Sequence, residues 1–358
     1  MGQAQQDRGR VAMTIEAARA SVERLSVRAV PLAGAPDAAL ARPLSTQALA
    51  HLVAGHARLG SLPDGDAHAA RALLLASALV ERATPVGGGL GWGYDADVDT
   101  PFGRFAGGRP NALATAHAAH ALLDAATLAR RPDLAEAPRL ALAWACADLL
   151  VEHRGERLFV PTPESSRPIH SVNLLLASLA ARCADWASDA WRAGEDAYAY
   201  SLARQRSDGS WPCGETHELR AVDAVHLARI LESLAVWEER TGDADVAVAL
   251  TAATAALLAR LGPLEREPRR PVEESRRLAI VAAGLAAAAH VDDRALPTAG
   301  RLLDRALASG ERRAVRALRA RREAPAGSRM DDGIALVALA GYLTAIGRTS
   351  AEPAADVG

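Results

Sequence analysis

Apolar residues recur with a helical period along most of the chain, and glycine and proline interrupt them about every 25 to 30 residues. Alanine and leucine dominate these apolar positions, and both are strong helix formers. The pattern predicts an all-α protein with helices near residues 13–29, 43–58, 66–83, 110–128, 133–152, 168–184, 187–205, 220–239, 242–260, 272–289, 296–318 and 331–346.

The connections between these helices alternate in kind. Short links such as Arg130–Asp133 and Arg240–Asp243 follow every second helix, whereas long loops rich in glycine and proline precede most of those helices. The unit of helix, long loop, helix and short turn recurs about every 50 to 65 residues, and six units fill the chain. Six hairpins can close as an (α/α)6 toroid, an inner ring of helices inside an outer one, and the alternative is an open solenoid.

The ring would form one domain over residues 13–348, with tails at 1–12 and 349–358. Its inner helices should be the richest in small residues. Two segments meet this expectation, "NALATAHAAHALLDAA" from Asn111 and "LAIVAAGLAAAAH" from Leu278.

The charged residues exclude several classes of function. All 41 basic residues are arginine, because the chain of 358 residues contains no lysine. This excludes a lysine Schiff base, an internal pyridoxal site and a P-loop lysine. The net charge of −2 is spread along the chain, so we expect no nucleic-acid partner. The stretch Arg312–Arg322 is interpreted as a solvated helix face.

Cysteine usage and hydropathy predict a cytoplasmic protein. The three cysteines, Cys146, Cys183 and Cys213, lie far apart, which argues against a disulfide framework. The N-terminus lacks the apolar core of a secretory signal, and no run of about 18 uncharged apolar residues predicts a membrane span.

One motif carries a family resemblance. Gln205, Gly209 and Trp211 in "QRSDGSW" match the Q-x-x-x-G-x-W core of the QW repeat. The chain thus resembles the α/α toroids of squalene cyclases, terpenoid cyclases and protein prenyltransferase β subunits. Four segments between Gly91 and Leu234 resemble most closely the single-domain, prenyltransferase-like toroids found beside polysaccharide biosynthesis genes: "GWGYDADVDTPFGRFAGGRPNALATAHAAHALLDA", "IHSVNLLLASLAAR", "RQRSDGSWPCGE" and "VDAVHLARILESL".

A ring of this kind would bring the long loops together at one mouth of the toroid. Three loops would then place their polar side chains in one neighbourhood. These side chains are Asp95, Asp97, Asp99, Arg104, Arg109 and Asn111 in the first loop, Arg167, His170 and Asn173 in the second, and Glu215, His217, Asp223 and His226 in the third.

The pair Asp97 and Asp99 resembles an incomplete form of the D-x-D-D acid motif of class II terpene cyclases, in which an aspartic acid protonates an alkene. Thr100 stands where the motif has its last aspartate. Such an acid must stay neutral until it reacts, which requires neighbours that raise its pKa. The alternatives are a polar substrate-binding or acid/base role and a turn-forming role.

Asp223 and His226 form the second candidate for chemistry. Standing three residues apart near a helix start, they would project from one face, where a carboxylate oriented on an imidazole makes a general base. Glu215 would be a further acid/base group. The alternative is an aspartate that caps the helix and a histidine in the core.

A zinc site is a weaker hypothesis. Cys213, His217, Asp223 and His226 are all permitted zinc ligands, although their spacing matches no established metal motif and the Asp-x-Cys pair of prenyltransferases is missing. No cofactor is predicted otherwise.

Aromatic residues are scarce but gather in the mouth loops. Trp92, Tyr94, Phe102, Phe105 and Trp211 would stack against sugar faces there, or Trp92 and Trp211 would only pin the loops to adjacent helices. They are fewer than the pocket of a cation-stabilising cyclase requires.

Three functional hypotheses remain. The first is an epimerase- or lyase-like enzyme acting on a carbohydrate or uronate, with Arg104, Arg109 and Arg167 holding its anionic groups. The second is an isoprenoid enzyme that uses Asp97 or Asp99. The third is a toroid that binds a partner or glycan without turnover. Asp331 and Asp332 either face the cavity or cap the last helix.

Overall fold

The computed structural model describes residues 16–22, 44–100, 102–185, 188–262, 271–319 and 327–351. Helices make up most of these residues, and three short β-hairpins lie between them. The helices are a segment at 16–22, α3 (Thr46–Gly60), α4 (Asp66–Val80), α5 (Ala112–Ala129), α6 (Glu136–Trp144), α7 (His170–Arg182), α8 (Ser188–Leu202), α9 (Ala224–Thr241), α10 (Ala244–Ala259), α12 (Pro271–Ala287), α13 (Ala295–Arg319) and α14 (Gly327–Ala351).

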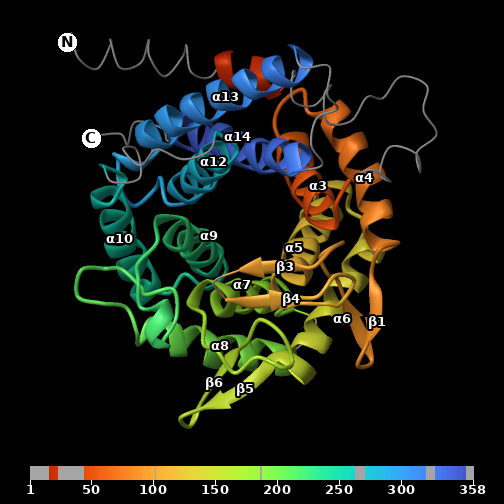
Figure 1. The fold of residues 1–358 in the computed structure, drawn as a ribbon, viewed down its shortest axis with the longest axis vertical. Coiled ribbons are helices and arrows are strands. Elements are labelled where there is room, and N and C mark those ends of the chain that lie inside the picture. Colours follow the sequence, from red (N-terminus) through yellow and green to blue (C-terminus); the bar gives the residue numbers. More distant parts are fainter. Residues whose placement is uncertain are drawn as a thin grey trace, which may run out of the picture.

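Every second helix belongs to an inner ring. In this ring α3 contacts α5, α5 contacts α7, and the contacts continue through α9 and α12 to α14, which packs back against α3. The helices α4, α6, α8, α10 and α13 lie outside them (Figure 1). The contact between α14 and α3 closes the ring. The predicted (α/α)6 toroid is therefore confirmed, and the open solenoid is wrong.

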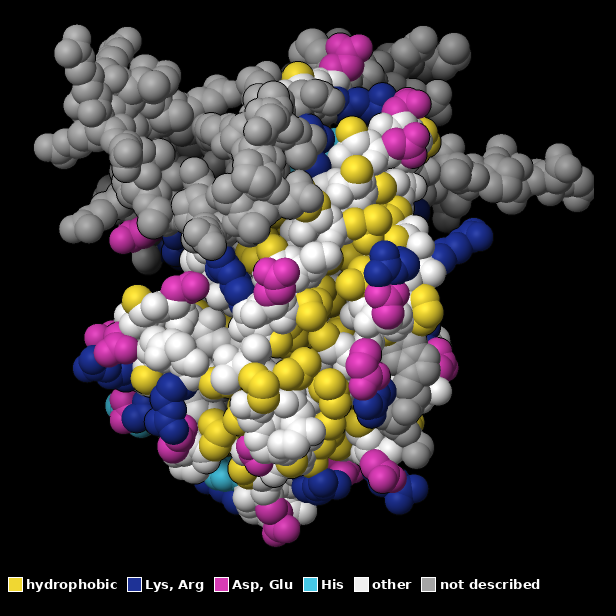
Figure 2. Space-filling view, turned by 90° about the vertical axis from the view of Figure 1, so that its right-hand side faces the viewer, with side chains coloured by type: hydrophobic (Ala, Val, Ile, Leu, Met, Phe, Trp, Pro, Cys, Tyr) yellow, Lys and Arg dark blue, Asp and Glu magenta, His cyan; other side chains and the backbone are white. Residues whose placement is uncertain are grey.

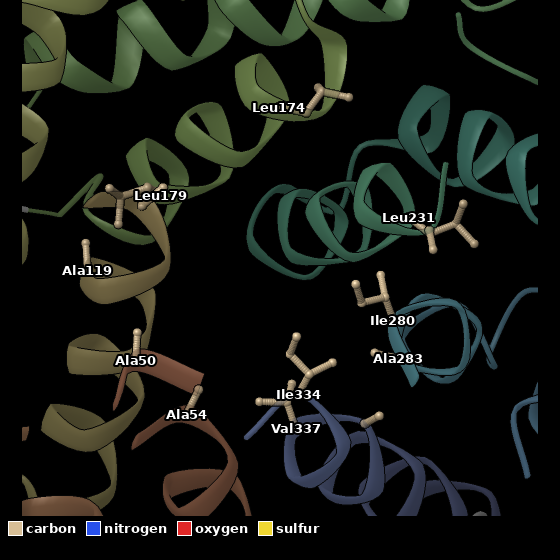
Figure 3. Packing of buried hydrophobic residues seen from close by; sticks show 14 of the residues in the cluster. Ala50, Ala54, Ala119, Leu174, Leu179, Leu231, Ile280, Ala283, Ile334 and Val337 are labelled. Atoms are coloured by element: carbon tan, nitrogen blue, oxygen red, sulfur yellow. The ribbon is translucent and has the colours of Figure 1, made fainter. Parts of the chain in front are cut away.

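Small residues let the inner helices approach one another closely. A Cβ atom added to Gly284 of α12 would lie 2.6 Å from the carbonyl oxygen of Ala228 in α9, so the two backbones nearly touch there. Ala50 and Ala54 of α3 face this interior beside Ala119 of α5, and larger side chains such as Ile280 lie across from them (Figure 3). The two alanine-rich segments named from the sequence thus belong to α5 and α12 of the inner ring, although the outer helix α10 is about as rich in alanine as α5.

Local signals in the sequence set the helix boundaries. The Asn111 side chain caps α5 by accepting a hydrogen bond from the Ala114 N–H at 3.0 Å. At the other end Arg130 adopts a left-handed conformation with φ 52°, which stops the helix. Gly242, with φ 64°, ends α9, and Asp243 directly caps α10. The short links predicted from the sequence at Arg130–Asp133 and Arg240–Asp243 therefore coincide with the C-terminal ends of α5 and α9.

The hairpins were not predicted. They are β1 (Thr84–Val86) with β2 (Gly89–Gly91), β3 (Val98–Thr100) with β4 (Gly103–Phe105), and β5 (Leu150–His153) with β6 (Glu156–Phe159), all antiparallel. The helix predicted over 133–152 is wrong at its C-terminal end. There α6 passes into a π-helical turn, Ala145–Leu149, and the chain continues as β5.

The long loops lie together on one face of the ring, here called the mouth face. Ile169 pairs with Gly214 in an antiparallel bridge, which joins the loop before α7 to the loop before α9. The Ala112 N–H donates to the Pro161 carbonyl at 2.9 Å, which joins the start of α5 to the loop before α7. The β3–β4 hairpin extends inward from α5 toward α9 (Figure 1). The predicted neighbourhood of three loops therefore exists.

Charge is mixed on the face of the ring shown in Figure 2, where arginine and acidic side chains are interspersed among hydrophobic ones. Among the described helices, none combines the length and apolar character needed to cross a membrane. Residues 1–12 lie outside the described residues, as do the side chains of Asp332 and of the stretch Arg312–Arg322 and most of the segment 349–358.

Candidate functional site

A cleft of about 530 Å³ opens on the mouth face between the β3–β4 hairpin, the start of α5 and the loop that follows β6. We call it the mouth cleft. Its charged lining consists of three arginines and one glutamate, so it carries a net positive charge. Its polar and aromatic lining residues are Phe102, Arg104, Phe105, Arg109, Asn111, Trp144, Thr162, Glu164, Ser165, Ser166 and Arg167.

Two buried donors in this lining have no partner. Trp144 is 1% exposed and its indole Nε1–H makes no hydrogen bond. The amide nitrogen Nδ2 of Asn111, also 1% exposed, is likewise unpaired, because only the oxygen of this side chain is used to cap α5. Buried donors are normally satisfied, and an unpaired one costs about 1 to 3 kcal/mol. Both residues line the cleft, and within the described part of the chain both donor atoms lack a partner.

The three arginines of the cleft differ in how strongly they are engaged. Arg104 forms an ion pair with Asp97, and Arg109 forms a looser one with Glu164 at 3.3 Å. Arg167 is exposed and has no ion pair within the described residues. Exposed pairs of this kind hold their partners weakly. All three guanidinium groups can therefore turn to an anionic ligand, as the sequence predicted for them.

Asp97 is held in its ionised form. Its Oδ1 accepts a hydrogen bond from the Gly107 N–H at 2.8 Å, and its Oδ2 pairs with Arg104. These two contacts lower the pKa of Asp97. Asp99 is exposed on β3, where the register places it opposite Arg104. These contacts stabilise the carboxylate and do not supply the raised pKa that the neutral-acid hypothesis requires, and the roles of Asp97 and Asp99 remain predictions.

The tryptophans of the mouth loops are structural. Trp92 is fully buried and donates from Nε1 to the Leu79 carbonyl at 2.8 Å. Trp211 is equally buried and donates to the Ser201 carbonyl at 2.6 Å. Both side chains pin loops to neighbouring helices, so their predicted stacking against a sugar is wrong. Tyr94 is also buried, edge-on to the Phe105 ring at 5.4 Å.

Glu215 lies outside the lining of the mouth cleft, in an ion-paired cluster beside the β5–β6 hairpin. It accepts hydrogen bonds from the Tyr200 hydroxyl and the Arg204 guanidinium, and His153 and Arg154 each lie 3.7 Å from its other oxygen. Burial raises the pKa of Glu215, but the two hydrogen bonds outweigh burial and bring the pKa below its ordinary value. Glu215 is thus an ionised group in this cluster, and its predicted catalytic role remains untested.

His170 and Asn173 are buried at the start of α7, where they hold neighbouring elements together. The Asn173 oxygen accepts from the Phe159 N–H at 2.8 Å, and its nitrogen donates to the Ser201 hydroxyl at 2.8 Å. That hydroxyl also lies 3.1 Å from Nδ1 of His170. Burial lowers the pKa of His170 to about 4. Neither residue lines the mouth cleft, so direct binding of substrate by them is not supported.

Asp223 caps α9 and does not orient the imidazole of His226. Its Oδ1 accepts from the backbone N–H groups of Val225 and His226 at 2.9 and 3.0 Å, and its Oδ2 lies 3.8 Å from Arg277. No hydrogen bond joins the carboxylate to the ring of His226. The predicted carboxylate–imidazole pair is therefore wrong in geometry, because Asp223 precedes the helix and its carboxylate faces the free N–H groups of the first turn.

His226 nevertheless lies at the mouth. Its ring centre is 6.2 Å from that of Phe102, at the tip of the β3–β4 hairpin, and Phe102 also lines the mouth cleft. Burial, assisted by His170, lowers the pKa of His226 to about 3. His226 is thus a neutral imidazole next to the hairpin.

The weak zinc candidates do not converge. Among the described residues, no three His, Cys, Asp or Glu side chains form a group that could hold a metal ion. His217 is exposed in a short 3-10 turn, whereas Cys213 is half-buried and burial raises its pKa to about 11.

Trp144 is the site residue that sequence reasoning missed. It belongs to the outer helix α6 and lies 33 positions after Asn111 in a segment predicted only as helix. The β1–β2 hairpin, which packs on α6, carries a recognisable signal, because Gly87 and Gly88 both have positive φ as a two-residue hairpin turn requires. The Gly87–Gly88 pair thus predicts a β-hairpin at this position, but nothing in the sequence pattern indicates that Trp144 lines a cleft.

No protein-family model and no curated protein matches the sequence. Solved structures match over most of the chain. A family 76 glycoside hydrolase from a bovine Bacteroides thetaiotaomicron strain is 10% identical with a TM-score of 0.61, covering 94% of this chain and 78% of its own. A family 76 α-1,6-mannanase from Salegentibacter is 9% identical with a TM-score of 0.59, covering 91% and 98%.

Cellobiose 2-epimerase from Bacillus thermoamylovorans is a third similar structure, with 9% identity, a TM-score of 0.56 and coverage of 82% of this chain and 87% of its own. At these identities the similarity shows the fold alone, an α/α toroid. None of these three structures is described as a terpenoid cyclase, so the resemblance to that branch remains a prediction.

Proposed function

We propose that this protein takes an acidic carbohydrate into the mouth cleft and acts on it by acid/base chemistry, as an epimerase- or lyase-like enzyme. The observation that carries the proposal is the set of donors in the cleft lining. Asn111 and Trp144 each have a buried N–H group without a partner, and of the three arginines two have exposed ion-pair partners and Arg167 has none among the described residues.

The chemistry of a uronate fits this lining. Its carboxylate offers two oxygens to a guanidinium, and its ring hydroxyls and ring oxygen accept hydrogen bonds from buried N–H groups. Phe102 and Phe105 supply aromatic surface in the same cleft. The cleft volume of about 530 Å³ lies within the range of small-molecule sites, roughly 300 to 1,000 Å³.

Two further observations favour a carbohydrate over an isoprenoid. The similar structures include proteins described as mannanases and a cellobiose epimerase, and one mannanase is described in complex with α-1,6-mannotetrose. The second is that the contacts of Asp97 lower its pKa, whereas alkene protonation needs a carboxyl group whose pKa is raised. Catalytic roles for Glu215, Asp99 and His226 remain predictions.

The test compares three ligands by thermal stabilisation: a trigalacturonate, a mannotetraose and geranylgeranyl diphosphate. A ligand at one hundred times its Kd stabilises the folded state by about 2.7 kcal/mol. We expect stabilisation by trigalacturonate and little by the neutral sugar. An Arg167→Gln variant should raise the Kd for trigalacturonate about tenfold, because it removes a charge-assisted contact of about 1.4 kcal/mol.

The matched control is Arg131→Gln, which removes an exposed arginine paired with Asp133 on an outer turn. It should bind trigalacturonate like the wild-type protein. Stabilisation by the diphosphate alone, or equal stabilisation by both sugars, would contradict the acidic-carbohydrate proposal. Binding of trigalacturonate without any chemical change in it would favour the non-catalytic reading.

A further inference from the structure

Two histidines face each other inside the ring, away from the residues that line the mouth cleft. His51 of α3 and His117 of α5 have ring centres 5.0 Å apart and ring planes inclined by 53°. His51 is 5% exposed, and His117 is half-buried although it lies on an inner helix. Within the described residues, neither ring makes a hydrogen bond.

The next histidine along α5 shows what a structural histidine does in this ring. Nε2 of His120 lies 3.2 Å from the Leu175 carbonyl and 3.3 Å from the Ser178 hydroxyl, and its other nitrogen lies 3.1 Å from Arg182. Its ring nitrogens are thus fully engaged, as is usual for a core residue. His117 has no such partners, which leaves its ring nitrogens available to a ligand.

Two arginines from the opposite side of the ring approach this pair. Arg229 of α9 pairs with Glu232 at 2.8 Å, and Arg276 of α12 pairs with the buried Asp331 of α14 at 2.7 Å. The second contact identifies Asp331 as an interior residue of the ring.

The charged groups around the pair keep both rings neutral. Burial is the largest cause, and Arg229, Arg58 and Arg276 add to it, so that the pKa of His51 falls to about 3. The pKa of His117 lies well below its ordinary value because of burial and then Arg229, with smaller effects from His51, His120 and Arg58. A neutral imidazole has a free lone pair, which is the form that accepts a proton.

We propose that His117 is the proton-transfer residue for the acidic sugar, with His51 as a positioning residue. This inference rests on the proposed function. The Asn111 end of α5 lines the mouth cleft, and His117 lies six residues further along the same helix, about 9 Å deeper. To reach His117, a sugar chain anchored in the cleft must extend past Phe102, which lies beside His226 of the inner ring.

The reaction step conserves atoms and charge. A ring nitrogen of His117 takes the proton from the sugar carbon next to the carboxylate, and the electron pair of that C–H bond moves into the carboxylate to form an enediolate. Arg229 stabilises the added negative charge. The imidazolium then returns its proton to the same carbon. Arg229 and Arg58 lower the pKa of His117, and the negative charge of the incoming carboxylate opposes them. The basicity of His117 therefore rises when substrate binds.

The experiment is solvent exchange. Trigalacturonate is incubated with the full chain in D2O, and deuterium at the carbon next to the carboxylate is measured by NMR. Removing a general base costs about 10²- to 10⁴-fold. We therefore expect His117→Gln to slow exchange at least about 100-fold while thermal stabilisation by trigalacturonate persists. His290→Gln, which changes an exposed histidine paired with Glu238, should exchange normally.

A second measurement distinguishes a proton-transfer role of His117 from a merely structural one. The imidazole of His117, followed by NMR, should have a higher pKa with trigalacturonate bound than without it, and His51→Gln should change the pH profile of exchange. Wild-type exchange by a folded His117→Gln variant would overturn the inference, as would stabilisation by trigalacturonate without exchange in the wild type. If trigalacturonate does not stabilise the wild-type protein, the proposed function is contradicted, and the inference about His117 then loses its basis.

Discussion

Mild acid should destabilise this fold strongly, because several histidines are buried in neutral form. His51, His56, His170 and His226 are each at most 5% exposed. Burial is the main cause that lowers their pKa values, to about 4 for His170 and about 3 for the other three, from an ordinary 6.5. Such groups resist protonation only while the chain is folded.

The sign and size of the effect follow from proton linkage. Below pH 6.5 the unfolded chain binds protons at these four histidines and the folded chain does not, so the free energy of unfolding falls as the pH falls toward the folded pKa values. Between pH 7.5 and 5.5 each histidine contributes a loss of about 1.3 kcal/mol. Four together contribute up to about 5 kcal/mol, which is a large part of the roughly 5 to 15 kcal/mol typical of native proteins.

The measurement is urea unfolding followed by circular dichroism at pH 7.5, 6.5 and 5.5. The pH window excludes carboxylates such as Asp97, whose pKa is lowered and which titrate below it. His56→Gln should reduce the pH dependence by about 1.3 kcal/mol, whatever its effect on stability at pH 7.5. A free energy of unfolding that stays constant within about 1 kcal/mol over this range would refute the reasoning.

Two further predictions concern backbone positions. Asp223→Ala should lower the free energy of unfolding by about 1 kcal/mol because α9 loses its cap, and Asp223→Ser should restore most of it; an equal loss in both variants would contradict the capping role. Gly209→Ala should lower the free energy of unfolding, measured with urea, clearly more than Gly242→Ala does. Both glycines have positive φ, but only at Gly209 would the added Cβ clash, because it would lie 2.2 Å from the Ala252 carbonyl oxygen. Equal costs would show that the loop before Trp211 moves freely.

Some of the candidate site was readable from the sequence. Arg104, Arg109 and Arg167 do share one cleft with Asn111, as the convergence of long loops at a toroid mouth predicts. The role of Asp223 could not be predicted from the sequence. An aspartate that caps a helix and an aspartate that orients an imidazole both stand three residues before a histidine near a helix start, so the sequence pattern is the same. Only the observed hydrogen bonds to two backbone N–H groups separate them.

The sequence by itself determined the architecture of this protein. The helical period of the apolar residues and the alternation of short turns with long glycine-rich loops depend on local propensity, which can be read residue by residue. Tertiary structure alone decided which polar groups meet. Trp144 and Asn111, each with an unpaired donor, line one cleft, and His51 approaches His117 across two helices, because the closed ring brings together residues 33 and 66 positions apart. Such meetings depend on long-range packing, and no local pattern encodes them.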